Sequence, residues 1–204
     1  ETSTGENKDS WTGDKFYDLY VSDIKDANSF TAPELFKGPF NSEYNDGTLA
    51  FNKDYTEVFF TRCGSSDRKV DDYCGIYVSN LLPDGGWAEP IALPFFDDTM
   101  NIGTPCLSPD GNTLFFAATN PDGYGGSDLY MSKRTETGWD AASNIGQVIN
   151  TSGNEVFPYF DNEGNFYFSS DKHPGMGGLD IFSATWKNGK FSNIKNLEYP
   201  INSG

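Results

Sequence analysis

Short apolar runs separated by Gly-, Asn- and Asp-rich turns make up most of the chain. The clearest set lies in residues 104–145, where residues 114–118 and 129–132 are runs of strand length. The first run is apolar on both faces of a strand, so it predicts a strand packed between two layers. Asp-Gly, Pro-Asp-Gly and Gly-Gly sequences bound these runs and argue against helix. The segment therefore predicts a meander of four antiparallel strands.

The same pattern recurs in four units along the chain. In each unit an Asp-apolar or Gly-apolar pair opens the third strand, and an aromatic residue followed six positions later by an apolar residue marks the fourth. The third-strand pairs are Asp18-Leu19, Gly75-Ile76, Asp128-Leu129 and Asp180-Ile181, and the fourth-strand markers are Phe30 and Phe36, Trp87 and Leu93, Trp139 and Ile145, and Phe191 and Leu197. A period of about 50 residues is typical of propeller blades.

The predicted fold is therefore all-β, a β-propeller of four-stranded antiparallel blades. We expect one domain over residues 1–204, with an outer half-blade in residues 1–40 and complete blades in residues 41–98, 99–148 and 149–204. The first unit lacks its two inner strands, so three blades and a half would form part of a ring. Either the chain is a fragment of a larger propeller, or the missing blades come from other sequence. An open arc would leave edge strands able to pair with another chain.

The charge balance narrows the classes of partner. The chain has 30 acidic and 14 basic residues, a net charge of −16, and a field of that sign repels phosphate backbones. Nucleic acid and anionic lipid headgroups are therefore poor partners. The surplus of acidic residues serves solubility, or it attracts a basic partner or a cation. Ca²⁺ is therefore the one candidate cofactor. No apolar run reaches the roughly 18 residues of a transmembrane segment.

Three cysteines occur at strand positions. Cys63 ends a second strand and Cys74 begins a third, so the two would lie side by side across an antiparallel pair, where a disulfide is geometrically feasible. The alternative is a pair of free thiols. Cys106 lies in an apolar first strand and is expected to be a small buried residue. A disulfide would indicate an oxidising compartment.

Acidic residues at strand starts are the main candidates for chemistry. Asp18, Asp128 and Asp180 precede third strands, and we expect each carboxylate to accept backbone N–H bonds from its own loop and so pin the blade corner. Metal ligation is the alternative, but no EF-hand-like spacing supports it. Asp46 and Glu155 match one another before first strands, near the expected mouth of the channel. They are predicted to be solvated loop-end acids. The alternative is a glycosidase pair, which needs a separation of about 5–10 Å.

Other catalytic signals are weak. No Gly-x-Ser-x-Gly sequence is present, so the sequence lacks the turn that presents the nucleophile of a hydrolase triad. The only histidine is His173, so there is one candidate for the base of such a triad. Trp87 and Trp139 could bind glycans if exposed, but their register with Phe30 and Phe191 predicts packing. The chain is expected not to be an enzyme.

Three phrases carry a resemblance to a known family. They are SPDGNTLFF at residues 108–116, GYGGSDLY at residues 123–130 and HPGMGGLDIF at residues 173–182. They resemble the WD40-like, TolB-type β-propeller repeat of OmpA-family envelope lipoproteins of Bacteroidota, including the PorE-like component associated with type IX secretion. The second blade departs from this pattern, because DDYCG at residues 71–75 replaces the Gly-Gly-x-Asp loop.

The resemblance implies a non-catalytic scaffold in the periplasm, associated with the outer membrane, that binds envelope proteins. Contact with peptidoglycan would come through flanking domains that are not in this sequence. Asp98-Thr99-Met100 resembles the short O-glycosylation motif of such proteins, which makes Thr99 a predicted acceptor. The alternative functions are a propeller glycoside hydrolase and a glycan-binding module, acting on envelope or dietary polysaccharide.

Overall fold

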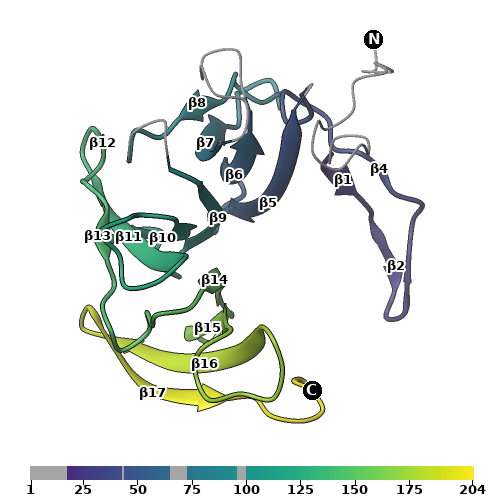
Figure 1. Cartoon of the computed structure of the whole chain (residues 1–204). Helices are drawn as coiled ribbons and strands as arrows, with labels where there is room; N and C mark the ends of the chain where they lie inside the picture. The colour runs from purple at the N-terminus through teal and green to yellow at the C-terminus, as the bar shows by residue number, and fades with distance from the viewer. Residues whose placement is uncertain (1–17, 43, 65–72, 96–99) are drawn as a thin grey trace.

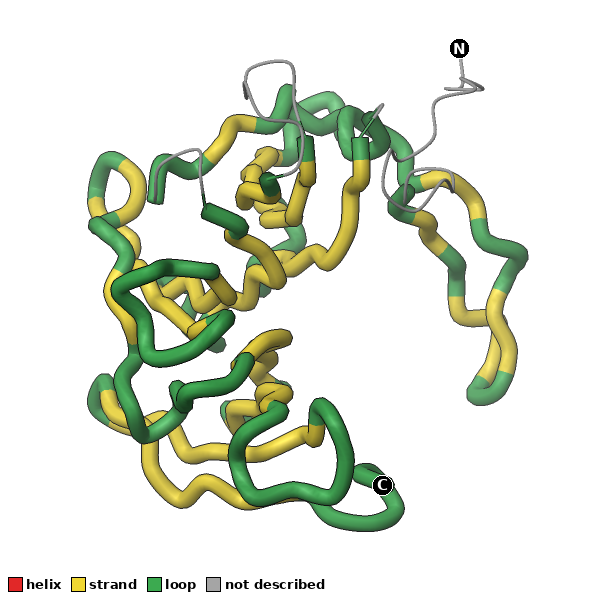
Figure 2. Tube along the Cα trace, viewed as in Figure 1, coloured by secondary structure: helices red, strands yellow, loops and turns green. Residues whose placement is uncertain are grey.

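The computed structural model describes residues 18–42, 44–64, 73–95 and 100–204. Within these ranges the regular elements are all β-strands, joined by loops and turns (Figure 2). Four units follow one another around a common centre as an open arc (Figure 1). In the described ranges no helix has the length and hydropathy to cross a membrane.

The three complete blades are antiparallel sheets whose strands pair in chain order. The second blade contains β5 (Asn45–Phe51), β6 (Glu57–Cys63), β7 (Cys74–Asn80) and β8 (Ile91–Ala92). The third contains β9 (Ile102–Leu107), β10 (Thr113–Ala118) and β11 (Asp128–Thr135), with an outer edge divided between β12 (Gly138–Trp139) and β13 (Ser143–Asn144). The fourth contains β14 (Glu155–Phe160), β15 (Asn165–Ser170), β16 (Asp180–Lys187) and β17 (Lys190–Asn196).

The first unit is an outer half-blade. β1 (Tyr20–Val21) pairs with β4 (Glu34–Leu35), and between them β2 (Ile24–Asp26) and β3 (Ser29–Phe30) form a short hairpin. Neither pair has a further strand beside it in the part of the chain that the structure describes. The predicted all-β propeller, with three complete blades and an outer half-blade, is therefore confirmed. The residue boundaries assigned to each blade stay a prediction.

The four units are equivalent at the opening of their third strands. In each unit the apolar marker of the fourth strand donates its backbone N–H to the carbonyl oxygen of the residue that opens the third. These bonds, of 2.8–3.1 Å, join Phe36 to Leu19, Leu93 to Ile76, Ile145 to Leu129, and Leu197 to Ile181. The positions that the sequence pattern predicts to be equivalent in the four units are therefore equivalent in the sheets.

Aromatic side chains fill the spaces between neighbouring blades. Phe40 and Phe60 are fully buried between the first and second units. Phe115 lies between the third and fourth blades, with its ring centroid 5.5 Å from that of Phe160 and 5.6 Å from that of Phe166. Such offset and edge contacts add to the burial of large apolar area. The many aromatic residues of this chain therefore hold the blades in fixed relative positions.

Trp87 and Trp139 both belong to this interblade packing. The ring centroid of Trp87 is 5.4 Å from that of Phe40, and that of Trp139 is 5.6 Å from that of Phe59. The guanidinium of Arg134 lies 4.4 Å above the Trp139 ring. Their role is the packing that the register predicts, so neither is an open platform for a glycan.

Candidate functional site: the groove between the inner strands

The innermost strands of the three complete blades lie next to one another. β9 contacts both β5 and β14, and all three surround the centre of the arc (Figure 1). Each inner strand carries a β-bulge, at Gly47–Leu49 in β5 and at the corresponding points of β9 and β14. A bulge bends its strand and re-aims the side chains beside it. The three bulges therefore shape the surface that faces the centre.

The bulges hold three residues in a left-handed backbone conformation. The φ angle is 28° at Thr48, 53° at Thr104 and 55° at Phe157. For residues with a branched or bulky side chain this conformation costs about 1–2 kcal/mol each. The same cost recurs at the same position in three blades, and backbone strain of this kind concentrates at binding sites.

A groove with a volume of about 450 Å³ runs across the bulges. Leu49 is 37% exposed in it, Phe157 50% and Tyr159 58%. Its lining is apolar apart from hydroxyl groups and comprises Thr48, Leu49, Ala50, Phe51, Thr104, Pro105, Cys106, Leu107, Phe157, Pro158, Tyr159 and Phe160. Among the described residues no carboxylate, imidazole or amine lines this groove. Its surface is suited to binding apolar groups.

Cys106 is the one thiol in the groove lining, and it is buried. Burial raises the pKa of the Cys106 thiol to about 12. The thiolate is the reactive form of cysteine, so at neutral pH this residue remains an unreactive thiol.

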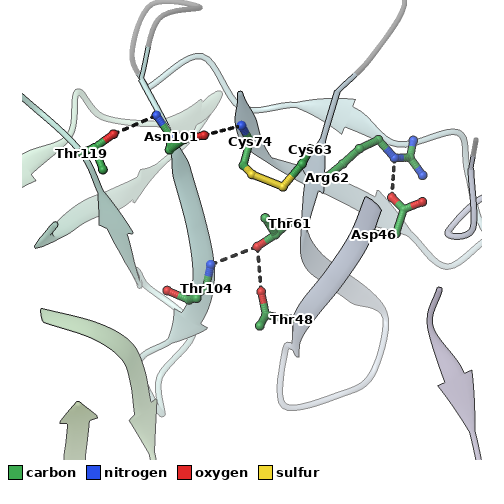
Figure 3. Close-up of a disulfide and its surroundings, with 9 residues drawn as sticks. All are labelled: Asp46, Thr48, Thr61, Arg62, Cys63, Cys74, Asn101, Thr104 and Thr119. Carbon is green, nitrogen blue, oxygen red and sulfur yellow. Dashed lines mark hydrogen bonds and ion pairs between the residues drawn. A yellow bond between two sulfur atoms is a disulfide. The ribbon is translucent and has the colours of Figure 1, made fainter. Parts of the chain in front are cut away.

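Thr61 of β6 joins two of the bulges across a blade boundary. Its hydroxyl shares a hydrogen bond of 2.8 Å with Thr48 Oγ1 and accepts the backbone N–H of Thr104 at 3.0 Å (Figure 3). A methyl group added at Gly103 would lie 3.0 Å from Thr61 Cγ2, so the second and third blades meet closely here. The groove is therefore built on a fixed contact between blades.

Asp46 is not the solvated acid that its position predicted. It is 1% exposed, and its Oδ1 lies 2.5 Å from Arg62 Nε (Figure 3). Its Oδ2 accepts the backbone N–H and the hydroxyl of Ser42, each at 2.7 Å. Burial raises the pKa of Asp46 against the opposing effect of Arg62 and Ser42. The carboxylate fixes the connector that leads into β5.

Glu155 has the same role before β14, so the prediction of a solvated acid is wrong there too. It is fully buried and accepts hydrogen bonds from Thr151 N at 2.7 Å and from the hydroxyls of Thr151 and Ser170 at 2.6 Å. Because each carboxylate is engaged within its own blade and neither lines the groove, the two do not form the facing pair of a glycosidase.

The corner acids Asp128 and Asp180 accept bonds from their own Gly-rich loops. Asp128 Oδ2 accepts Tyr124 N at 2.6 Å and Asn144 Nδ2 at 2.9 Å. Asp180 Oδ2 accepts the N–H groups of Met176 and Gly177. Asp18 is exposed, and residues 1–17, which would supply its loop, lie outside the described part. Within the described ranges no three His, Cys, Asp or Glu residues gather as metal ligands would.

In the second blade a disulfide occupies the corner. Gly75 stands where Asp128 and Asp180 stand in the next two blades, and the structure joins the adjacent Cys74 to Cys63, its partner across β6 and β7, by a disulfide (Figure 3). The second blade thus has a covalent link where the third and fourth blades have a corner carboxylate. Thr99 lies outside the described residues.

His173 links the third and fourth blades. Its Nε2 is 2.8 Å from the carbonyl oxygen of Ile149, and its ring centroid lies 5.6 Å from that of Phe168 and 5.2 Å from that of Phe182. The only histidine is therefore packed between blades.

Three asparagines after fourth strands bond to the third strand of their own unit, a role that the sequence pattern did not reveal. Asn150 is 1% exposed, accepts Leu129 N at 2.8 Å and donates to Leu129 O at 2.8 Å. Asn41 and Asn202 make the same two bonds to Leu19 and Ile181. Each asparagine side chain thus accepts from the N–H and donates to the C=O of the same strand residue, as the backbone of a neighbouring strand would. The signal was an Asn five residues after the fourth-strand marker.

We expect Asn150→Asp to lower the free energy of unfolding by about 2 kcal/mol, because the new carboxylate would face two acceptors, Leu129 O and Asn144 Oδ1, in place of an amide donor. Urea denaturation measures this change. Asn188→Asp, at the exposed β16–β17 turn, is the control and should stay within about 0.5 kcal/mol. Equal effects of the two variants would contradict a clamp at Asn150.

The blades define a β-propeller, and solved TolB-type propellers superpose on it. TolB of Acinetobacter baumannii superposes with a TM-score of 0.52 at 17% identity, over 83% of this chain and 35% of that one. A putative TolB of Agrobacterium tumefaciens gives 0.54 at 15% identity, over 84% and 52%. A puromycin hydrolase gives 0.52 at 14% identity, over 89% and 28%.

The chain therefore spans about a third to a half of the length of the two TolB structures. No family model and no curated protein matches the sequence. At these identities the likeness is one of fold, shared by TolB proteins and by a hydrolase.

Proposed function

We propose that this chain is a non-catalytic protein-interaction scaffold of the periplasm, associated with the outer membrane. It would belong with the propellers of OmpA-family envelope lipoproteins of Bacteroidota that are linked to type IX secretion. The observation that carries this proposal is the apolar groove of the inner strands, which rests on three strained bulges and has only hydroxyls as polar side-chain groups.

The groove suits a segment of another protein. Leu49, Phe157 and Tyr159 remain partly exposed beside buried prolines, and exposed apolar clusters on rigid frames commonly mark protein contacts. The interblade aromatic packing holds the three strands in place, so a partner would meet a preformed surface. This combination favours binding of a partner protein over catalysis.

The compartment is proposed from the disulfide. Disulfides such as Cys63–Cys74 persist in oxidising compartments, which include the bacterial periplasm, and are rare in the cytosol. The TolB-like fold supports the same location, since the resemblance of the repeats is to envelope proteins.

We expect Phe157→Asn to abolish the capture of envelope proteins by this protein when it carries an affinity tag. The free energy of unfolding should change by less than about 1 kcal/mol. Asn tolerates the left-handed backbone at this position but removes the exposed ring. Pull-down from the native envelope, compared with thermal unfolding, measures both quantities.

Tyr55→Asn is a matched control. Tyr55 is also aromatic, 69% exposed and left-handed, with a φ of 57°, but it does not line the groove. Capture should survive in this variant. Loss of capture in both variants, or in neither, would contradict the groove as the contact surface.

The alternative function, a propeller glycoside hydrolase, predicts turnover by the wild-type protein. We expect no hydrolysis of chromogenic glycosides, because the two candidate acids are buried in structural contacts away from the groove. Measurable turnover that Glu155→Gln removes would favour the enzyme over the scaffold.

A further inference from the structure

The outward face of the fourth blade differs from the equivalent faces of the second and third. One row of directly paired residues crosses each sheet at the same level. In the second blade the row is Ala50, Phe59, Val78 and Ile91. In the third it is Cys106, Phe115, Met131 and Ser143. In the fourth it is Tyr159, Tyr167, Ser183 and Lys195.

The central positions of the rows in the second and third blades are apolar and covered by the next blade, with Val78 and Met131 packed against the interblade clusters. Only the outermost residues of these rows, Ile91 and Ser143, are exposed. Phe59 and Phe115 are both fully buried. In the fourth blade the position of Val78 and Met131 is taken by Ser183, and a lysine ends the row. Buried packing selects apolar residues, whereas hydroxyl and ammonium groups are retained where they stay hydrated or meet polar partners. The face of the fourth blade is therefore built for polar contacts.

This face also gathers positive charge in a strongly acidic protein. Residues 181–197 contain three lysines and no acidic residue, although acids outnumber bases overall. Lys187 pairs directly with Lys190, and Ser183 with Lys195. Because alternate residues of a strand share a face, the three lysines lie on the same side as Ser183. All three are exposed. The hairpin β16–β17 is thus a local cationic surface.

A groove of about 510 Å³ crosses this face, a volume within the range of small-ligand sites. Its lining combines amides, hydroxyls, an ammonium and an aromatic ring, from Asn165, Tyr167, Ser183, Thr185, Asn193 and Lys195. The ring of Tyr159 lies beside it, with its centroid 6.3 Å from that of Tyr167.

Two acidic residues of the β14–β15 turn, Asp161 and Glu163, lie near this groove. Burial, a hydrogen bond to Asp161 and the charges of Asp161 and Glu163 together raise the pKa of Tyr167. Asp161 accepts hydrogen bonds from Asn165 N and Nδ2 at 2.8 Å and from Tyr167 OH at 3.2 Å. The bonds from Asn165 lower the pKa of Asp161, so this carboxylate is ionised at neutral pH and engaged with Asn165 and Tyr167. The lysines on β16 and β17 meet the ligand from the opposite side.

We propose that the outward face of the fourth blade binds an extended oligosaccharide that carries carboxylate groups. Sugar rings would lie over Tyr167 and Tyr159, with the amides and hydroxyls of Asn165 and Thr185 bonding ring hydroxyls. Lys195, and beyond it Lys187 and Lys190, would bind the carboxylates. Charge complementarity selects this occupant, because the face is cationic, polar and aromatic, while the rest of the chain repels long polyanions.

The test is calorimetric titration with a hexamer of galacturonic acid and with its methyl ester, which keeps the rings and removes the charges. We expect the acid to bind and the ester to bind at least about fivefold more weakly, with the difference shrinking as salt is raised. Lys195→Gln should weaken binding of the acid about fivefold. Ser183→Val, which restores the residue of the second blade, should weaken binding of both hexamers.

Controls separate this site from the groove of the inner strands. Lys53→Gln removes an exposed lysine at the β5–β6 turn and should leave binding unchanged, as should Phe157→Asn. Equal affinity for acid and ester, no binding by the wild-type protein, or loss of binding in Lys53→Gln would overturn the proposal. So would concentration-dependent self-association abolished by Lys195→Gln, because a second copy would then cover the face.

Discussion

We expect Arg62→Met to lower the free energy of unfolding by about 3–5 kcal/mol at pH 7. The substitution leaves the Asp46 carboxylate buried without the guanidinium 2.5 Å away, and an uncompensated buried charge costs about this much. It also removes the two bonds from Arg62 to the carbonyl oxygens of Pro39 and Phe40. Urea denaturation at several pH values measures the loss.

The deficit should shrink as the pH falls. Burial already raises the pKa of Asp46 in the folded protein, so folding disfavours its ionised form. The stability that this group contributes is present below its unfolded pKa and is lost as the pH rises through the folded one. Without Arg62 the folded pKa rises further, so the penalty is largest at pH 7 and smaller near pH 4. A deficit that does not vary with pH would show that the lost bonds to Pro39 and Phe40 dominate.

The third blade supplies the matched control for this pair. Ile102 and Ala118 stand where Asp46 and Arg62 stand and face one another across β9 and β10, both nearly fully buried. The double variant Asp46→Ile/Arg62→Ala should therefore recover to within about 1–2 kcal/mol of the wild type and lose the pH dependence. If the double variant were as unstable as Arg62→Met, the isolated charge would not be the cause.

The fold could be predicted because the repeat signals come from the backbone itself. Markers such as Leu129 and Ile145 recur because every blade makes the same inter-strand bond at that point. The apolar run of residues 114–118 is explained by a sheet that is covered on both faces, since all five residues are buried. These are local requirements, repeated in register, and one sequence displays them four times.

The site could be predicted only in part, because burial depends on contacts between blades. Asp46 and Glu155 were placed at the correct strand, but their solvent exposure depends on connectors and on Arg62 and Ser170, which no local pattern marks. The left-handed residues of the bulges are Thr48, Thr104 and Phe157. None of them is a Gly or an Asn, the residue types that would predict a left-handed backbone. Likewise, the polar face of the fourth blade could be recognised only from the strand pairing, which shows that Tyr167 takes the position of Phe115.

We expect Cys63→Ser/Cys74→Ser to lower the free energy of unfolding by about 3 kcal/mol, which corresponds to about 6–12 °C in thermal midpoint. The bridge closes a loop between residues 11 apart in sequence and limits the freedom of the unfolded chain. It also stands in place of the corner carboxylate that the third and fourth blades use, so its loss removes the covalent restraint on this corner. Differential scanning calorimetry with and without a reductant measures the effect.

Thiol counting makes this expectation specific to the bridge. The denatured, unreduced wild-type protein should titrate one thiol, that of Cys106, and three after reduction. Reductant should lower the midpoint of the wild-type protein to that of the double variant and leave the variant unchanged. Cys106→Ala removes the remaining thiol and should keep the response to reductant, because the bridge is intact. Three thiols before reduction would show that the pair is open, and the blade corner would then depend on the hydrogen bond from Cys74 N to Asn101 Oδ1 at 2.9 Å.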